Sequence, residues 1–180
     1  MIARRKRIAA GLGLAGSLAA TPAALAALAA PTRRLAFDNL HTGETLDVAY
    51  YENGCYVGDA LAEVNHVLRD YRTGDVHVIE PRLLDLLTVL SASLETKTAF
   101  GVISGYRSPQ TNAMLHEKSG QVASGILHMQ GQAIDIRLPG VNSATVRDAA
   151  LRLSIGGVGY YPTSDFVHVD VGRVRRWQGA

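Results

Sequence analysis

Hydrophobic side chains recur along the first half of the chain with the spacing of helices. Leu61, Val64 and Leu68 fall on one face of a predicted helix over residues 59–70. A second helix is expected to begin at Pro81, because proline suits the first helical position. The face of this helix is lined by Leu83, Leu84, Leu87, Leu90 and Leu94. An apolar stripe of this kind faces a core, so we predict that this is the main core helix.

Period-2 alternation and turn residues predict the strands. Leu46, Val48 and Tyr50 alternate within a polar region over residues 31–57, which predicts an edge hairpin. Further strands are expected over residues 100–104, 133–138, 156–161 and 166–171, further helices over 109–118 and 143–153, and a loop over 120–125. Helices come mostly first and strands mostly second, with short connections. This order favours an α+β domain with a small central antiparallel sheet flanked by helices.

The first thirty residues have the pattern of an export signal. Arg4 to Arg7 form a cationic start, followed by an apolar run from Ile8 to Ala20 and small residues up to Ala30. The paired arginines allow the twin-arginine route, and the general secretory route fits as well. The alternative is an uncleaved anchor helix, which the weak hydrophobicity of Ala and Gly and the presence of Pro22 disfavour. We therefore expect an export signal over residues 1–30 and residence in the periplasm or cell envelope.

The rest of the chain, residues 31–180, has the size and composition of a single domain. Hydrophobic residues make up 47% and charged residues 19% of the sequence, so disorder is not expected. The net charge is +2, and no basic stripe with interleaved aromatics points to nucleic acid. Cys55 is the single cysteine, so the domain folds without an internal disulfide. Nothing in the sequence requires more than a monomer, or a stable membrane insertion once the signal is removed.

Two histidines and an aspartate near the ends of predicted strands form a candidate metal site. His128 and Asp135 are separated by a segment that can turn the chain, and His168 lies in the alternating segment from Phe166 to Asp170. A Zn²⁺ ion held by three such ligands keeps one position for water, as catalytic zinc sites do. A histidine among strand valines is also commonly a hydrogen-bonded core residue, so His168 alone does not decide the matter.

Two further residues complete a candidate hydrolytic site. Asp165 stands three residues before His168 and is placed to act as a general base, with Asp170 as the alternative. Arg107, in the segment Ser104–Ser108, offers a cation that can hold a substrate carboxylate, and a structural salt bridge is the alternative for it. A metal, a base and an arginine together suggest metal-assisted hydrolysis of an amide.

These residues resemble the motif series of the M15 zinc peptidases, which act on bacterial cell-wall peptides. The series consists of SGYRS at 104–108, then His128 with Gly131 and Asp135, then Asp165-x-x-His168. The segments 127–139 and 160–172 are most similar to the murein endopeptidase K subgroup. Many members carry glutamate where this chain has Asp165.

The resemblance implies an α+β fold of the M15 and hedgehog-like kind. It also implies that His128, Asp135 and His168 bind Zn²⁺, that Asp165 is the general base and that Arg107 contacts the substrate. The expected function is that of an exported zinc metallopeptidase hydrolysing peptide cross-links or stem peptides of peptidoglycan.

Two other functions remain open at this point. A D-Ala-D-Ala carboxypeptidase or dipeptidase would need a pocket for a terminal carboxylate, with Arg107 as its anchor. A wall-binding module with structural zinc would need a fourth protein ligand, for which Asp165 and Asp170 are the candidates.

Other polar residues are expected to be structural or solvated. His66 and His116 are predicted to face solvent, and His77 is predicted to be structural rather than to line the cleft. The tail with Arg173, Arg175 and Arg176 is expected to be solvated, or to be loosely attracted to an anionic surface.

Overall fold

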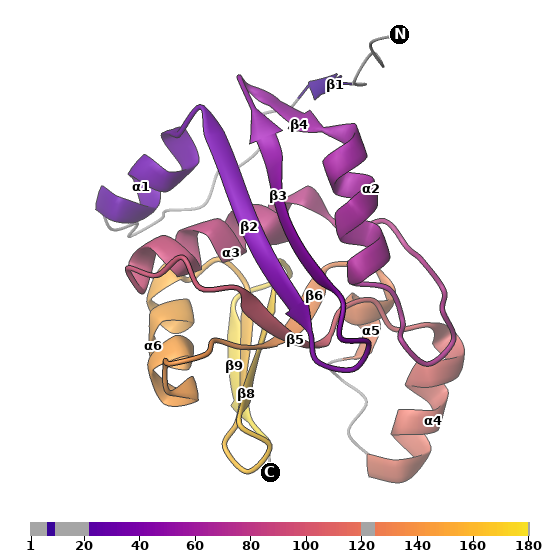
Figure 1. Ribbon diagram of the computed structural model, residues 1–180. Helices are drawn as coiled ribbons and strands as arrows, with labels where there is room; N and C mark the ends of the chain where they lie inside the picture. Colours follow the sequence, from indigo (N-terminus) through magenta and orange to yellow (C-terminus); the bar gives the residue numbers. More distant parts are fainter. Residues whose placement is uncertain (1–6, 10–21, 120–124, 180) are drawn as a thin grey trace, which may run out of the picture.

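A computed structural model describes residues 7–9, 22–119 and 125–179. Its strands are β1 (Arg7–Ala9), β2 (Thr32–Asn39), β3 (Thr45–Glu52), β4 (Cys55–Val57), β5 (Phe100–Ser104), β6 (Ala133–Arg137), β7 (Gly157–Tyr161), β8 (Phe166–Asp170) and β9 (Arg175–Gln178). Its helices are α1 (Pro22–Ala29), α2 (Gly58–Val67), α3 (Pro81–Ser93), α4 (Pro109–Ser119), α5 (Gly125–Met129) and α6 (Ser143–Leu153). Helices and strands of the described residues thus form a mixed fold around one sheet (Figure 1).

The sheet is larger than the sequence predicts, and it is not purely antiparallel. Within the described residues, nine strands follow the order β1-β4-β3-β2-β5-β6-β8-β7-β9. Two neighbouring pairs are parallel, β2 with β5 and β7 with β9. The first of these pairings joins the N-terminal hairpin to the C-terminal strands, and the second adds the tail of the chain. The prediction of a small antiparallel sheet is therefore wrong, because long-range pairings merge what the local patterns present as separate pieces.

The predicted hairpin over residues 31–57 forms from β2 and β3, but it does not lie at an edge. β2 has β5 on its other side, and β3 has β4. Four residues of β2 point into the interior, and two of them, Arg33 and Asn39, are polar. Arg33 forms a buried ion pair with Asp85 of α3, and the amide of Asn39 donates a hydrogen bond of 2.9 Å to the carbonyl oxygen of Val67. These buried polar residues hide the interior position of β2 from a hydrophobicity pattern.

The prediction for the core helix is confirmed. Its leucines Leu83, Leu84, Leu87 and Leu90 are each fully buried. α3 lies across β2 and also packs against α1 and α6 (Figure 1). α6 begins as expected, since the side chain of Asn142 accepts a hydrogen bond of 2.8 Å from the backbone nitrogen of Ala144. This is a standard N-terminal cap.

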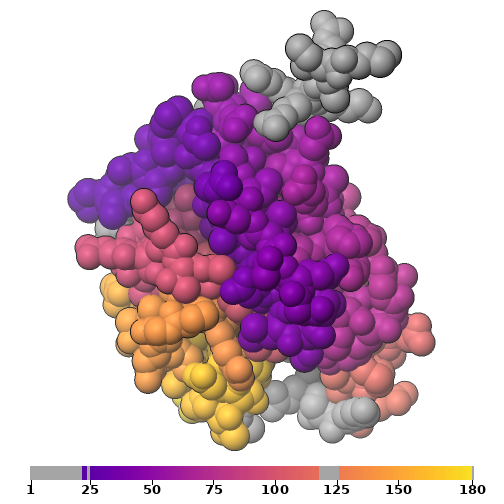
Figure 2. Space-filling model, viewed as in Figure 1, coloured from indigo at the N-terminus to yellow at the C-terminus, as the bar shows by residue number. Residues whose placement is uncertain are grey.

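The two faces of the C-terminal strands have different surroundings. α6 packs against β7 and β8, and its Val146 shares a surface hollow with Ile136 and Val167. Asp135 and His168 alternate with these residues along β6 and β8, so they lie on the opposite face. In the space-filling view, the indigo and purple N-terminal segments, with α1 at the upper left, cover the upper and right-hand parts of the molecule, and the orange and yellow C-terminal segments, which include α6, lie at the lower left (Figure 2).

Only part of the predicted export signal is described. Residues 7–9 form β1 beside β4, and α1 covers part of α3, with Leu28 against the core. Residues 1–6 and 10–21 of this segment, and residues 120–124 of the predicted loop, lie outside the described residues. Among the described segments, none of the helices has the length and apolar character needed to cross a bilayer.

Candidate metal centre

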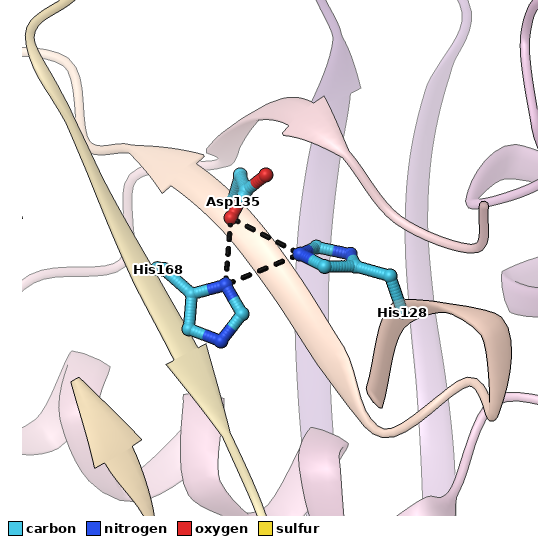
Figure 3. Close-up of side chains that lie close together, drawn as sticks. All are labelled: His128, Asp135 and His168. Carbon is cyan, nitrogen blue, oxygen red and sulfur yellow. Dashed lines mark hydrogen bonds and ion pairs between the residues drawn. The ribbon is translucent and has the colours of Figure 1, made fainter. Parts of the chain in front are cut away.

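Three separate elements carry the side chains of the candidate metal centre (Figure 3). His128 comes from α5, Asp135 from β6 and His168 from β8. Asp135 and His168 are direct cross-strand partners in the antiparallel pair of β6 and β8, which places both side chains on one face at one level. The sheet register alone therefore brings together two of the three residues.

A tight turn at Gly131 delivers His128 to the same point. Gly131 has a φ of +66°, and a Cβ there would lie 2.1 Å from the carbonyl oxygen of Val78. The backbone nitrogen of Gly131 donates a hydrogen bond of 3.2 Å to the carbonyl oxygen of His128. The carbonyl oxygen of Gly131 accepts one of 2.9 Å from the backbone nitrogen of Glu80. Only glycine fits this turn, because both the positive φ and the close backbone exclude a side chain.

The three polar groups converge on one buried point. Nδ1 of His168 is 2.9 Å from Oδ1 of Asp135, and Nε2 of His128 is 3.1 Å from that Nδ1. Nε2 of His128 is also 3.2 Å from Oδ1 of Asp135. The residues are 1%, 6% and 1% exposed for His128, Asp135 and His168. Burying two imidazoles and a carboxylate together is costly unless a proton or a cation joins them.

The outer nitrogen of each imidazole has a hydrogen-bond acceptor. Nδ1 of His128 is 2.7 Å from the carbonyl oxygen of Gly105, and Nε2 of His168 is 2.9 Å from Oδ2 of Asp170. When each outer nitrogen donates its N–H to that acceptor, the inner nitrogen presents a lone pair to the shared point. Metal-ligating histidines are oriented in this way, by a carbonyl or a carboxylate behind the ring.

The electrostatic environment favours a positive charge at this point. Burial alone would raise the pKa of Asp135, but the imidazoles of His128 and His168 hold it well below its usual range. Burial lowers the pKa of His128 and keeps its ring neutral. Burial opposes charge on His168 as well, yet its hydrogen bonds to Asp135 and Asp170 raise its pKa. Metal binding requires an ionised carboxylate and neutral imidazoles, so a metal ion at this point would take the place of the proton that Asp135 and Asp170 favour on His168.

Arg107 lies beside the predicted ligands but is turned toward the protein. Its Nη2 donates to Oδ2 of Asp135 at 3.2 Å and to Oγ of Ser104 at 3.3 Å. Its side chain is 13% exposed, and its Nε is buried without a hydrogen-bond partner among the described residues. The salt bridge that was the alternative for Arg107 is therefore present, and its partner is the candidate ligand Asp135.

The structure does not bring Asp165 to the other site residues. It sits in the turn between β7 and β8 with a φ of +49°, and its side chain is 66% exposed. Its carboxylate is 3.9 Å from Nε of Arg137, whose guanidinium also donates to the carbonyl oxygens of Ser164 and Asp165, each at 2.6 Å. In this arrangement Asp165 belongs to the hairpin turn and not to the buried cluster.

Asp170, the alternative base, is fully buried, and both of its carboxylate oxygens accept hydrogen bonds. Oδ2 accepts from His168 and from Nη2 of Arg175 at 2.7 Å. Oδ1 accepts from the backbone nitrogens of Gly157 and Gly172, each at 2.9 Å. These hydrogen bonds outweigh burial and hold the pKa of Asp170 below its usual range. Asp170 therefore stands behind the ring of His168, on the side away from His128 and Asp135.

Sequence reasoning missed the partners of Asp170 in the tail. Arg175 was expected to be solvated, but it lies in β9 and forms an ion pair with Asp170. Trp177 of the same strand has its ring centroid 5.0 Å from that of His168. The alternation of Arg175 and Trp177 in the sequence was the signal that could have indicated a strand here.

The other histidines lie away from the cluster. His77 stacks on Tyr106 with ring centroids 4.7 Å apart, and the exposed His66 faces Glu44.

The donor set fits a zinc ion. Among the described residues, His128, Asp135 and His168 form a group whose ligand atoms all lie within 4.8 Å of one another. Two neutral imidazole nitrogens and one carboxylate oxygen are ligands that Zn²⁺ accepts, and three protein ligands leave a fourth position for water or substrate. Asp170 does not close the set, because both of its oxygens have other partners.

Comparisons with known proteins agree with this geometry. The family model described as peptidoglycan L,D-endopeptidase MepK matches residues 27–177. The peptidoglycan L,D-endopeptidase MepK of Escherichia coli strain K12 is 42% identical over 176 residues, which is 97% of this chain and 96% of the relative. The probable peptidoglycan L,D-endopeptidase MepK of Haemophilus influenzae is 39% identical over 179 residues, 98% of this chain and 96% of the relative. The chain therefore belongs to the M15 peptidase family, in the group of the MepK peptidoglycan L,D-endopeptidases.

Proposed function

We propose that this protein is an exported zinc endopeptidase that hydrolyses L,D peptide cross-links of peptidoglycan. The observation that carries the proposal is the buried group of His128, Asp135 and His168, with both imidazoles oriented from behind. Relatives named as peptidoglycan L,D-endopeptidases, at 39–42% identity over nearly the whole chain, support the substrate class. We further propose that residues 1–30 are the export signal, that the periplasm or cell envelope is the place of action, and that the protein is a monomer.

The residues of the cluster would hold the metal through Nε2 of His128, Oδ1 of Asp135 and Nδ1 of His168. When bound, zinc supplies an activated water near neutral pH and polarises the scissile carbonyl. Arg107 holds the second oxygen of Asp135, so that the first oxygen points at the shared centre. We propose that Arg107 also supplies positive charge for the anion that develops as the amide is attacked.

Two aspartates near His168, Asp165 and Asp170, are the candidates for the proton acceptor. Asp165 is exposed in the hairpin turn and bonded to Arg137, so the role of base would require that turn to move toward the cluster. Asp170 is already an acceptor for several donors, so the role of orienting His168 suits it better than that of a base. Substitution of each aspartate by asparagine separates these roles.

The two rival functions have less support. A carboxypeptidase needs a cation free to hold a terminal carboxylate, whereas Arg107 is nearly buried and paired with Asp135. A wall-binding module with structural zinc needs a fourth protein ligand, whereas Asp170 faces the outer nitrogen of His168 and Asp165 lies in the exposed turn. An open three-ligand set favours catalysis.

The decisive experiment is incubation of the purified protein with peptidoglycan sacculi. Samples are compared as isolated, after a chelator, and after the chelator followed by zinc, and the released muropeptides are identified by mass. We expect loss of L,D cross-linked dimers that the chelator stops and zinc restores. His168→Ala should lose zinc and hydrolysis together, and His66→Ala is the matched control with an exposed imidazole. Intact sacculi in every sample, with zinc bound to the protein, would instead favour the wall-binding module.

A further inference from the structure

Side chains of the C-terminal strand β9 extend over the neighbouring strand β7 to His168 in β8. β9 pairs in parallel with β7, and Arg175 lies opposite Gly157 while Trp177 lies opposite Gly159. Gly159 is in turn the cross-strand partner of His168. Arg175 and Trp177 therefore share the face of the sheet on which the candidate metal ligands lie.

The two glycines of β7 make room for these side chains. A Cβ at position 157 would lie 2.3 Å from Nη1 of Arg175 and 2.4 Å from Oδ2 of Asp170. A Cβ at position 159 would lie 2.5 Å from Cε2 of Trp177. Contacts this short do not occur, so any larger residue would displace the side chains from β9. The alternation of glycines in β7 is therefore matched to the alternation of Arg175 and Trp177 in β9.

Arg175 acts on His168 through Asp170. Its Nη1 and Nη2 donate to Oδ1 and Oδ2 of Asp170 at 3.1 Å and 2.7 Å, so the guanidinium and the carboxylate meet as a two-pronged pair. The fully buried Asp170 accepts the N–H of His168 through the same Oδ2. A two-pronged pair fixes direction as well as distance. Together with the backbone N–H groups of Gly157 and Gly172, which donate to Oδ1, Arg175 thus fixes the carboxylate that orients the imidazole.

Trp177 packs against the same imidazole. Its ring is tilted by 53° against the ring of His168, at a centroid distance of 5.0 Å. The indole is itself held, because its Nε1 donates to the hydroxyl of Tyr161 at 3.0 Å and the guanidinium of Arg175 lies 5.0 Å from its ring centroid. Nε2 of His168 is therefore hydrogen-bonded to Asp170 and its ring lies against Trp177, and β9 supplies both Trp177 and the arginine that pairs with Asp170.

We infer that β9 is a clamp that sets the orientation of the metal ligand His168, with Arg175 and Trp177 as positioning residues. This inference rests on the proposed metal-binding role of His168 and assigns a role to two residues that the proposed mechanism does not use. Partners behind metal ligands typically contribute roughly 10–100-fold to metal affinity. The clamp is expected to act at that level, through geometry and not through contact with substrate.

The test is zinc affinity, measured by competition with a chromophoric chelator, for Arg175→Ala against Arg176→Ala. Arg176 is the matched control, because it is exposed and is the next residue of the same strand, with its side chain on the other face. We expect Arg175→Ala to weaken zinc binding roughly 10–100-fold and to change the visible absorption of the cobalt-substituted protein. Arg176→Ala should leave both unchanged. Wild-type affinity and an unchanged cobalt spectrum in folded Arg175→Ala would overturn the clamp.

Two further variants keep the test decisive. Arg175→Lys retains the positive charge but cannot form the two-pronged pair with Asp170. It should therefore fold, and should bind zinc with an affinity between those of the wild type and Arg175→Ala. If Arg175→Ala does not fold, Arg175→Lys carries the test, and wild-type affinity in it would refute the role of the two-pronged pair. Gly159→Ala should displace Trp177 and weaken zinc binding, and unchanged affinity would remove Trp177 from the clamp. Failure of the wild-type protein to bind zinc would reject the metal site itself, and the clamp with it.

Discussion

Replacing Asp170 with asparagine tests whether this residue orients His168 or acts as a base. The substitution keeps the shape of the side chain but replaces one oxygen with an NH₂ group. Oδ2 accepts from Nε2 of His168 and Nη2 of Arg175, and Oδ1 accepts from Gly157, Gly172 and Nη1 of Arg175. An NH₂ group at either position would face hydrogen-bond donors and no acceptor. If it faces His168, the imidazole can accept from it by moving its proton to Nδ1, where the metal would bind.

The expected magnitudes follow from this geometry. Breaking a buried ion pair costs about 3–5 kcal/mol. Arg175 is 23% exposed, so solvent screening favours the lower end, about 3 kcal/mol. At about 2–4 °C per kcal/mol for a chain of this size, Asp170→Asn should lower the melting temperature by about 6–12 °C. Zinc affinity should fall by roughly 10–100-fold.

Asp165→Asn is the matched control, because it makes the same change three residues before His168. Asp165 is 66% exposed, so this variant should retain zinc affinity and should change stability by no more than about 0.5 kcal/mol. Chelator competition and thermal unfolding measure both quantities, and release of muropeptides from sacculi measures activity. Wild-type zinc affinity in folded Asp170→Asn would refute the orienting role. Loss of hydrolysis in Asp165→Asn with zinc retained would establish Asp165 as the base and would require the hairpin turn to move.

Three further predictions concern the same site. Gly131→Ala should lower the melting temperature and weaken zinc binding, because a Cβ would lie 2.1 Å from the carbonyl oxygen of Val78, and wild-type values of both would contradict the need for glycine. Arg107→Ala should weaken zinc binding, because Arg107 holds Oδ2 of the ligand Asp135, and at saturating zinc it should still slow hydrolysis of sacculi by about 100-fold or more, the usual cost of losing one charge-stabilising donor; an unchanged rate at saturating zinc would leave Arg107 only a structural role. Apparent zinc affinity should fall as the pH is lowered, beginning above the ordinary histidine pKa of about 6.5, because Asp135 and Asp170 raise the pKa of His168 and its proton competes with the metal. Titration of zinc affinity across this range checks the last prediction, and a flat profile would exclude proton competition at His168.

The effect of pH on the stability of the metal-free protein has two parts with opposite signs. The pKa values of Asp135 and Asp170 are depressed in the folded state, so their contribution is complete above the unfolded pKa of about 3.9 and is lost as the pH falls below it. The pKa of His168 is raised, so its contribution is complete below about pH 6.5 and is lost as the pH rises through the folded pKa. Burial lowers the pKa of His128, so this residue costs stability as the pH falls below about 6.5 and offsets the gain from His168. We therefore expect the clearest loss of stability of the metal-free protein as the pH falls below about 3.9, where the two aspartates become protonated, and thermal unfolding at a series of pH values measures it.

The sequence was sufficient for the elements whose patterns are local. The leucines after Pro81 predicted α3 as the core helix, and this is confirmed. The alternation from Phe166 to Asp170 predicted β8. The resemblance to M15 peptidases, read from the segments around His128 and His168, is confirmed by the family model. Each of these signals lies within one helix, one strand or one short motif, where side-chain spacing and residue type carry the information.

The sheet was predicted less well, because its size depends on pairings between distant segments. The parallel pairing of β2 with β5 cannot be read from either strand, and Arg33 and Asn39 make β2 look exposed. The tail looked like a solvated run of arginines, yet β9 adds to β7. Backbone hydrogen bonds hold these strands together, and such bonds leave little trace in the sequence of either partner.

The sequence by itself determined which residues are candidates for the metal centre, and the tertiary structure decided what each candidate can do. The residue types and spacing selected His128, Asp135 and His168, together with two aspartates near His168. Only the packing shows that Asp170 stands behind the imidazole while Asp165 is exposed in a turn. The physical reason is that a carboxylate takes its role from its hydrogen-bond partners and its distance from water. Both are properties of the folded chain, set here by strands that pair across the sheet.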